Sequence, residues 1–178
     1  MARLLFMTDF SESYANKLLQ GIIQYTRDHT PWVVCKMPLS LRDNDRMDEV
    51  VRFAAAWKAD AIIGQFRPQD DLEAFRRHGI IPLCQDFRQR FPGFINISGD
   101  YALSGKLAAD YFIEKRVRNF AFFGLKGMVW SDGRRDGFLA EILARVPDAS
   151  FSLLERRDLD ATWWYDQSQL IDWLRSLP

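Results

Sequence analysis

Arg134 and Trp130 are residue types that suit a ligand with several hydroxyl groups. The arginine guanidinium is a planar fork whose N–H groups can donate to two adjacent hydroxyl groups. The tryptophan ring supplies a flat apolar face and excludes water. Asp100 has a carboxylate that could cap a helix only, or could also face the ligand and orient Arg134. Together these three residues could bind a ligand that carries hydroxyl groups.

Simpler interpretations of the same residues stay open. Arg134 could form a surface salt bridge with Asp132 or Asp136, and Trp130 could be an ordinary buried tryptophan. The sequence does not decide between ligand contact and these structural roles.

A second set of polar side chains follows the strands predicted in the first half of the chain. Open α/β sheets bind ligands at the carboxyl ends of their strands. We therefore expect these side chains to line a ligand-binding cleft. They are Asp9, Ser11 and Tyr14 after the first strand, Gln65 after the third and Asp86 after the fourth.

Catalytic chemistry has little support in the sequence. There is no Gly-x-Ser-x-Gly elbow, phosphate loop or dinucleotide fingerprint, and nothing pairs a nucleophile with a base. His29 and His78 stand at predicted helix ends, where capping is expected. Cys35 and Cys84 lie in apolar runs and are expected to be buried free thiols, with no cluster for a metal. We expect no catalytic residues, cofactor or metal. The alternative is a small-molecule enzyme on a flavodoxin-like α/β domain, with loop carboxylates as acid and base.

The charge balance bears on possible partners. The 178 residues include 24 basic and 24 acidic side chains, so the formal net charge is zero. No basic patch suits a phosphate backbone, so DNA contact is expected only through a domain that is not in this chain. No signal peptide precedes the first strand, and no apolar run approaches the ~20 residues of a membrane span. We therefore expect a cytoplasmic protein without membrane contact.

Strand-like and helical segments alternate along the chain. This alternation implies parallel sheets with right-handed crossovers, and hence the α/β class with helices on both faces. We expect a complete lobe over residues 1–98 and part of a second over 99–178. The predicted strands are 4–8, 32–37, 60–64, 80–84, 94–97, 119–123 and 151–154. The predicted helices are 43–57, 70–77, 100–115 and 134–145, with one more that ends near residue 28 and one near 165–174.

Residues 97–138 carry the most detailed predictions. Asp100 is expected to be the N-cap of the helix that follows. Residues 120–123 are a continuous apolar run, which predicts a strand covered on both faces. Residues 124–133 are predicted to be a loop that carries Trp130 and brings Arg134 to the first turn of the next helix. The helix after Asp100 has a predicted buried face made of Leu103, Leu107, Ala108, Tyr111 and Phe112.

The same region resembles a known family. Asp100 with Ser104-Gly105-Lys106-Leu107-Ala108-Ala109-Asp110-Tyr111, the run Asn119-Phe120-Ala121-Phe122-Phe123-Gly124, and Arg134 with Gly137-Phe138 resemble the ligand domains of the lactose and galactose repressors. The pattern Trp-x-x-x-Arg-x-x-small-Phe resembles the xylose-operon regulators in particular. These place such a domain before a DNA-binding domain of the arabinose-regulator (AraC) family. One departure is Tyr101, because the family usually has Asn after the aspartate.

The resemblance implies a type I periplasmic-binding-protein-like fold, with ligand bound between two lobes. It implies a sugar-sensing effector domain of a bacterial transcriptional regulator, with xylose or another pentose as effector. A second lobe with only two strands leaves an edge and an apolar face uncovered, so we expect the chain to form a homodimer or to expose part of residues 120–175. The family has about five or six strands in the second lobe, so the remainder of that lobe and the DNA-binding domain are expected to lie outside this chain.

Overall fold

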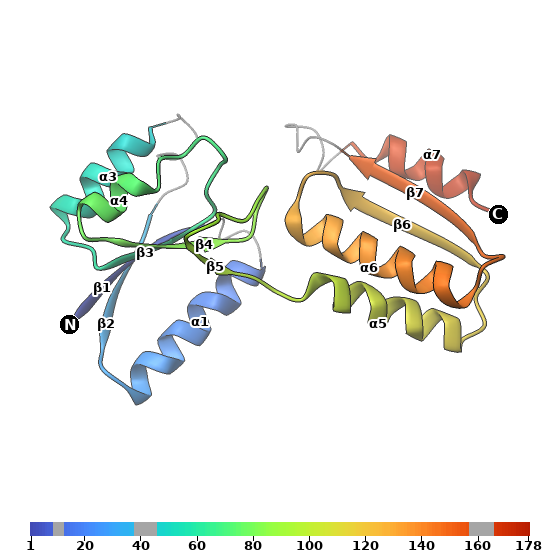
Figure 1. The fold of residues 1–178 in the computed structure, drawn as a ribbon, viewed down its shortest axis with the longest axis horizontal. Coiled ribbons are helices and arrows are strands. Elements are labelled where there is room, and N and C mark those ends of the chain that lie inside the picture. The colour runs from blue at the N-terminus through green and yellow to red at the C-terminus, as the bar shows by residue number, and fades with distance from the viewer. Residues whose placement is uncertain (9–12, 38–45, 157–165) are drawn as a thin grey trace. The chain divides into compact units, whose positions relative to one another are not determined.

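The computed structural model describes residues 1–8, 13–37, 46–156 and 166–178, and the chain divides into two compact units (Figure 1). The first unit is Met1–Ser98 and the second is Gly99–Pro178. Each unit has its own sheet and its own core.

The first unit is built on a five-stranded parallel sheet. The strand order is β2-β1-β3-β4-β5, so β1 has a neighbour on each side. Residues 4–7 of β1 are buried because the strand is paired along both edges and covered on both faces. The strands are β1 (Ala2–Met7), β2 (Trp32–Lys36), β3 (Ala61–Gly64), β4 (Ile81–Gln85) and β5 (Ile95–Ile97). All five strands predicted before residue 98 are therefore confirmed, with ends that shift by one or two residues.

Helices cover both faces of this sheet, as the sequence predicts. On one face α1 (Ser13–Asp28) packs Ala15 and Leu19 against Leu4, Phe6 and Ile63. The opposite face carries α3 (Met47–Ala56) and α4 (Glu73–Arg77). Residues 43–45, which were predicted to begin the second helix, lie outside the described residues.

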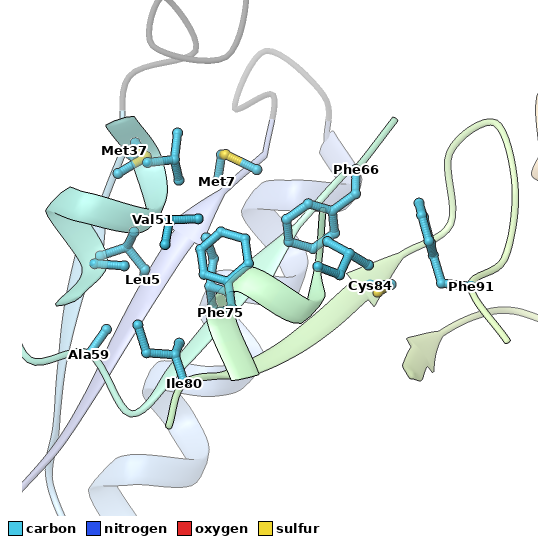
Figure 2. Packing of buried hydrophobic residues seen from close by; sticks show 14 residues of the cluster. Leu5, Met7, Met37, Val51, Ala59, Phe66, Phe75, Ile80, Cys84 and Phe91 are labelled. Atoms are coloured by element: carbon cyan, nitrogen blue, oxygen red, sulfur yellow. The ribbon is translucent and has the colours of Figure 1, made fainter. Parts of the chain in front are cut away.

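Figure 2 shows the larger core, which lies under α3 and α4. Phe66 and Phe75 are fully buried there, and their ring centres lie 6.0 Å apart. Phe91 meets Phe66 edge to face at 6.3 Å. Pairs of this kind add to the free energy gained from the burial of their area. The aromatic cluster therefore joins the segment after β3 to the helix and loop that follow.

Cys84 lies in that core with 1% of its surface exposed, whereas Cys35 is only partly buried, and both are free thiols as predicted. Burial raises the pKa of the Cys84 thiol to about 11, against a smaller opposing effect of Arg76. Because the thiolate is the nucleophile, iodoacetamide at about pH 8 is expected to alkylate Cys35 and leave Cys84 unmodified in the native protein. Peptide mass spectrometry measures both sites, and the urea-unfolded chain, in which both should react, is the control. Equal rates at the two sites in the native protein would contradict this prediction.

The second unit contains a two-stranded parallel sheet of β6 (Asn119–Leu125) and β7 (Ser150–Arg156). Within this unit, Figure 1 shows α5 (Tyr101–Glu114) and α6 (Val129–Arg145) on one side of the strands and α7 (Ser168–Ser176) on the other. Phe138 of α6 is the centre of the core, and its ring contacts those of Phe112, Phe120, Phe122 and Phe151. On the other side, Trp173 Nε1 of α7 donates to Ser152 Oγ at 2.9 Å.

The prediction that residues 119–123 are covered on both faces is wrong. Phe120 is buried, with 4% exposed, whereas Phe123 on the opposite face of the strand is 42% exposed. The side chains of a strand alternate between faces, and the packed helices α5 and α6 cover only one of them. The continuous apolar run therefore predicted more burial of β6 than the structure shows.

The predicted buried face of α5 is also wrong. Leu103, Leu107 and Tyr111 are 47%, 59% and 58% exposed, and the buried residues are Gly105 and Ala109. The reason is the close approach of α6. A Cβ atom at Gly105 would lie 2.1 Å from the carbonyl oxygen of Arg134, and one at Gly137 would lie 2.1 Å from that of Ala102. The helices meet through their small residues, so Leu103, Leu107 and Tyr111 are left exposed. Phe112, of the same predicted face, is 41% exposed, and its ring meets Phe138 edge to face.

Candidate functional site

The turn between β6 and α6 places Trp130 and Arg134 differently from the predicted loop. The helix α6 begins at Val129, so both residues lie on it, one turn apart on the same face. Two side chains of its first turn hold the preceding backbone. The Leu125 N–H donates to Ser131 Oγ at 2.8 Å, and the Gly127 N–H donates to Asp132 Oδ2 at 3.0 Å. These polar residues give the segment the composition of a loop although it is helical.

A pocket of about 330 Å³ lies at the carboxyl end of β6. This size is at the lower end of the range for small-molecule sites, roughly 300–1,000 Å³. Its walls are mainly apolar, and one guanidinium is the charged group among them. A small ligand with one apolar face and several hydroxyl groups matches these walls. The lining residues are Phe122, Phe123, Gly124, Leu125, Trp130, Ser131 and Arg134.

Arg134 is exposed at this pocket, and its guanidinium carbon lies 5.6 Å from the centre of the Trp130 ring. The salt bridges considered for Arg134 are made by its neighbour instead. Arg135 pairs with Asp132 at 3.1 Å, with Asp136 at 2.7 Å and with Glu155 of β7. Among the described residues, Arg134 has no hydrogen bond or ion pair, so its donors are available to a ligand. Trp130 is half-buried and lines the same pocket, and its contact with a ligand stays a prediction.

Asp100 caps α5 as predicted: its Oδ1 accepts a hydrogen bond from the Leu103 N–H at 2.9 Å. The carboxylate is exposed, and no contact with Arg134 is found in the part of the chain that the structure describes. Its second predicted role, orientation of Arg134, therefore stays a prediction.

Replacement of Asp100 by alanine is expected to lower the stability of the second unit by about 1 kcal/mol, because the free N–H groups of the first turn lose their acceptor. Asp100→Ser keeps an acceptor and should keep most of this stability. Urea unfolding followed by circular dichroism measures both variants, and an unchanged midpoint in the alanine variant would contradict the capping role. Sugar titration of the serine variant then tests separately whether the carboxylate also contacts ligand.

In the first unit, polar residues gather at the carboxyl ends of neighbouring strands. Gln65 follows β3 and Asp86 follows β4, and the two are only 3% and 4% exposed. Asp86 Oδ2 accepts from Ser98 Oγ at 2.5 Å and from Arg90 Nη2 at 3.5 Å. Its other oxygen, Oδ1, is buried and has no partner within the described residues. A buried acceptor left without a hydrogen bond costs about 1–3 kcal/mol, so this oxygen is a candidate ligand contact.

Thr8 is a residue that sequence reasoning missed. It directly follows β1, is fully buried, and its Oγ1 also has no partner among the described residues. Its position in the sequence could have identified it, because Thr8 is the polar residue at the carboxyl end of an otherwise apolar strand. Register places it beside Gln65, since Met7 of β1 pairs with Gly64 of β3.

Tyr14 lies in the first turn of α1 and is 44% exposed. Partial burial and, secondly, the charge of Asp86 raise the pKa of its phenol. The effect of Asp86 places the two residues near each other, as their predicted positions at one end of the sheet require. Asp9 and Ser11, the other two candidates in that loop, lie outside the described residues.

The two histidines of the chain lie at helix ends, as the sequence predicts. His29 follows α1 and its Nδ1–H donates to the Tyr25 carbonyl at 2.9 Å, while His78 is the C-cap of α4. Across the described ranges, no group of three or more His, Cys, Asp or Glu side chains could hold a metal ion. Among the helices described, none is both long and apolar enough to cross a lipid bilayer.

Comparison with known proteins supports the architecture. No family model matches the chain. It is 27% identical over 175 residues to the xylose operon regulatory protein of Haemophilus influenzae, a match that covers 93% of this chain and 43% of that protein. The chain thus spans less than half the length of this curated relative.

Solved structures resemble the chain at low sequence identity. A LacI transcriptional regulator from Lactobacillus brevis matches with a TM-score of 0.75 and 15% identity, over 98% of this chain and 64% of that one. The Cra regulator of Pseudomonas putida in complex with fructose 1-phosphate matches with a TM-score of 0.71 and 16% identity, over 99% and 66%. A periplasmic binding protein/LacI regulator from Alkaliphilus metalliredigens complexed with D-xylulofuranose gives 0.67 and 17%, over 90% and 59%.

The fold is the type I periplasmic-binding-protein-like fold. This confirms the predicted α/β class with parallel strands. The type I fold was predicted from the resemblance described above, and the two regulators match 99% and 98% of this chain.

Proposed function

We propose that this chain is the sugar-sensing part of a bacterial transcriptional regulator, with xylose or another pentose as effector. The observation that carries the proposal is the pocket at the end of β6. There Arg134 has hydrogen-bond donors that no described residue uses, beside the flat ring of Trp130. The relative named as a xylose operon regulator and the solved structure with D-xylulofuranose support a pentose.

The first unit, taken by itself, also has polar groups that could bind a hydroxylated ligand. The buried Asp86 Oδ1 and Thr8 Oγ1 can exchange hydrogen bonds with sugar hydroxyls, and Gln65 and Tyr14 lie at the same end of the sheet. The sugar acts as an effector only if it binds one conformation of the regulator more tightly than another.

DNA contact, in this proposal, belongs to an AraC-type domain outside this chain. The zero net charge of these residues supports that division, because phosphate contacts require a basic surface. We further propose that the protein acts in the cytoplasm as a homodimer, for which sedimentation velocity is the test. The similar proteins named above are regulators and a binding protein, so we propose a binding function without an enzymatic step.

The test is a thermal-shift screen of the chain and of the complete gene product. It includes D-xylose, other pentoses, hexoses and fructose 1-phosphate, and calorimetric titration follows with the sugar that gives the largest shift. A ligand at a hundred times its dissociation constant stabilises the native state by about 2.7 kcal/mol, which is a clear shift. A pentose is expected to give it. A response to fructose 1-phosphate alone would indicate that the effector is a sugar phosphate and not a pentose. No response to any sugar would overturn the proposal.

A further inference from the structure

The guanidinium of Arg134 lies near two aromatic rings from different helices. Its guanidinium carbon is 5.3 Å from the centre of the Tyr101 ring and 5.6 Å from that of Trp130. Tyr101 is the first residue of α5, and Trp130 is the second residue of α6. Both distances are within the ~6 Å over which a guanidinium is attracted to an aromatic face.

The nearby carboxylates are engaged elsewhere. Asp132, Asp136 and Glu155 all pair with Arg135. The type of partner matters for Arg134. A carboxylate would occupy its N–H donors, whereas an aromatic face attracts the cation without accepting the hydrogen bonds that point outward from the edge of the guanidinium. Two rings can therefore hold the guanidinium and leave its donors available.

The backbone fixes the place of the Tyr101 ring. A Cβ atom at Gly133 would lie 2.9 Å from Tyr101 Cβ, and one at Gly99 would lie 2.9 Å from its Cε1. The two glycines thus leave the space that the tyrosine fills. Gly105, on the next turn of α5, meets the carbonyl of Arg134 itself, so the backbones that bear the tyrosine and the arginine are in direct contact.

We propose that Tyr101 is a positioning residue for Arg134: its ring face, together with that of Trp130, orients the guanidinium for the sugar. The consequence for binding rests on the proposed function, while the effect on Arg134 does not. Loss of the face should let the guanidinium reorient and should weaken sugar binding by about two- to fivefold, the range expected from one exposed cation–π contact.

The experiment compares Tyr101→Leu, which removes the face, with Tyr101→Phe, which keeps it. Tyr111→Leu, on the same helix but with its ring against Phe112 and Lys115, is the matched control. The first readout is the Nε–Hε resonance of Arg134 in NMR of isotope-labelled protein, assigned by its loss in Arg134→Lys. Stacking predicts an upfield ring-current shift and a high order parameter. The size of the upfield shift and the order parameter should both decrease in Tyr101→Leu. Both should stay near their wild-type values in Tyr101→Phe and Tyr111→Leu.

The second readout is calorimetric titration of the same variants with D-xylose. Weaker binding in Tyr101→Leu, with wild-type binding in Tyr101→Phe, supports the proposal. An Arg134 resonance unchanged in Tyr101→Leu would overturn it whether or not any sugar binds. Equal losses in the Phe and Leu variants would also overturn it, because they would assign the effect to the hydroxyl. If wild type binds no sugar, the proposed function fails, and the resonance alone still decides the role of Tyr101.

Discussion

Arg134→Ala is expected to weaken sugar binding by about ten- to a hundredfold, which corresponds to the 1.5–3 kcal/mol of a hydrogen bond to a charged group. The guanidinium is the charged group in the lining of the pocket at β6, and no described residue competes for its donors. Arg134→Lys should recover only part of the loss, because lysine keeps the charge but lacks the planar fork. Calorimetric titration of the three proteins with D-xylose is the measurement.

The adjacent arginine is the matched control. Arg135 has a side chain that is 20% exposed and pairs with three carboxylates, one of them Glu155 on β7. Its replacement by alanine leaves these carboxylates without their cation, so stability should fall while the folded protein keeps its affinity. Arg134→Ala should show the reverse: lower affinity with unchanged stability. Equal affinity of wild type and Arg134→Ala would remove Arg134 from the site.

Gly105→Ala is expected to destabilise the second unit by about 3 kcal/mol, at the upper end of the usual cost of overpacking. The added Cβ would lie 2.1 Å from the Arg134 carbonyl oxygen, a backbone atom that cannot move without shifting α6. Gly137→Ala should have a similar effect, because its Cβ would meet the Ala102 carbonyl at the same distance. Hydrogen exchange with peptide resolution measures each unit separately, and the loss should appear in residues 101–145.

Gly21→Ala provides a control of opposite sign. Gly21 lies inside α1, and no atom of the described residues is found within 4 Å of a Cβ atom placed there. Alanine at such a position should stabilise the first unit by about 0.4–1 kcal/mol, because it restricts the unfolded chain. A Gly105→Ala variant as stable as wild type would show that α5 and α6 are not held at the contact seen in the structure.

The strands of the first unit were predictable because local signals sufficed. Each is a short apolar run bounded by glycine, proline or a polar residue, and the inner strands β1, β3 and β4 are the most buried, as in a parallel sheet covered on both faces. The start of α6 was not predictable in the same way. Ser131 and Asp132 bind the turn that precedes the helix, so the residues that begin the helix resemble those of a loop.

The buried face of α5 depended on a partner that local sequence does not reveal. The helix has a large apolar stripe and a stripe of small residues, and either could be buried. The small stripe is chosen because α6 presents Gly137 opposite it and the two backbones approach closely. The candidate site shows the same limit. Arg134 and Trp130 could be identified from their types and spacing, whereas Tyr101 and Thr8 could not, because their relevance depends on neighbours brought close by the fold.

The strand order of the first unit has a consequence for synthesis on the ribosome. β1 lies between β2 and β3, and its second neighbour is complete only when the chain has grown to Gly64. At typical bacterial to eukaryotic elongation rates of about 5–20 residues per second, the ~57 residues between them take roughly 3–11 seconds. Throughout that interval the run Leu4-Leu5-Phe6-Met7, which is buried in the finished sheet, is open to chaperones. β1, the most buried strand of this sheet, is thus also the strand with the longest delay before both of its edges can be paired.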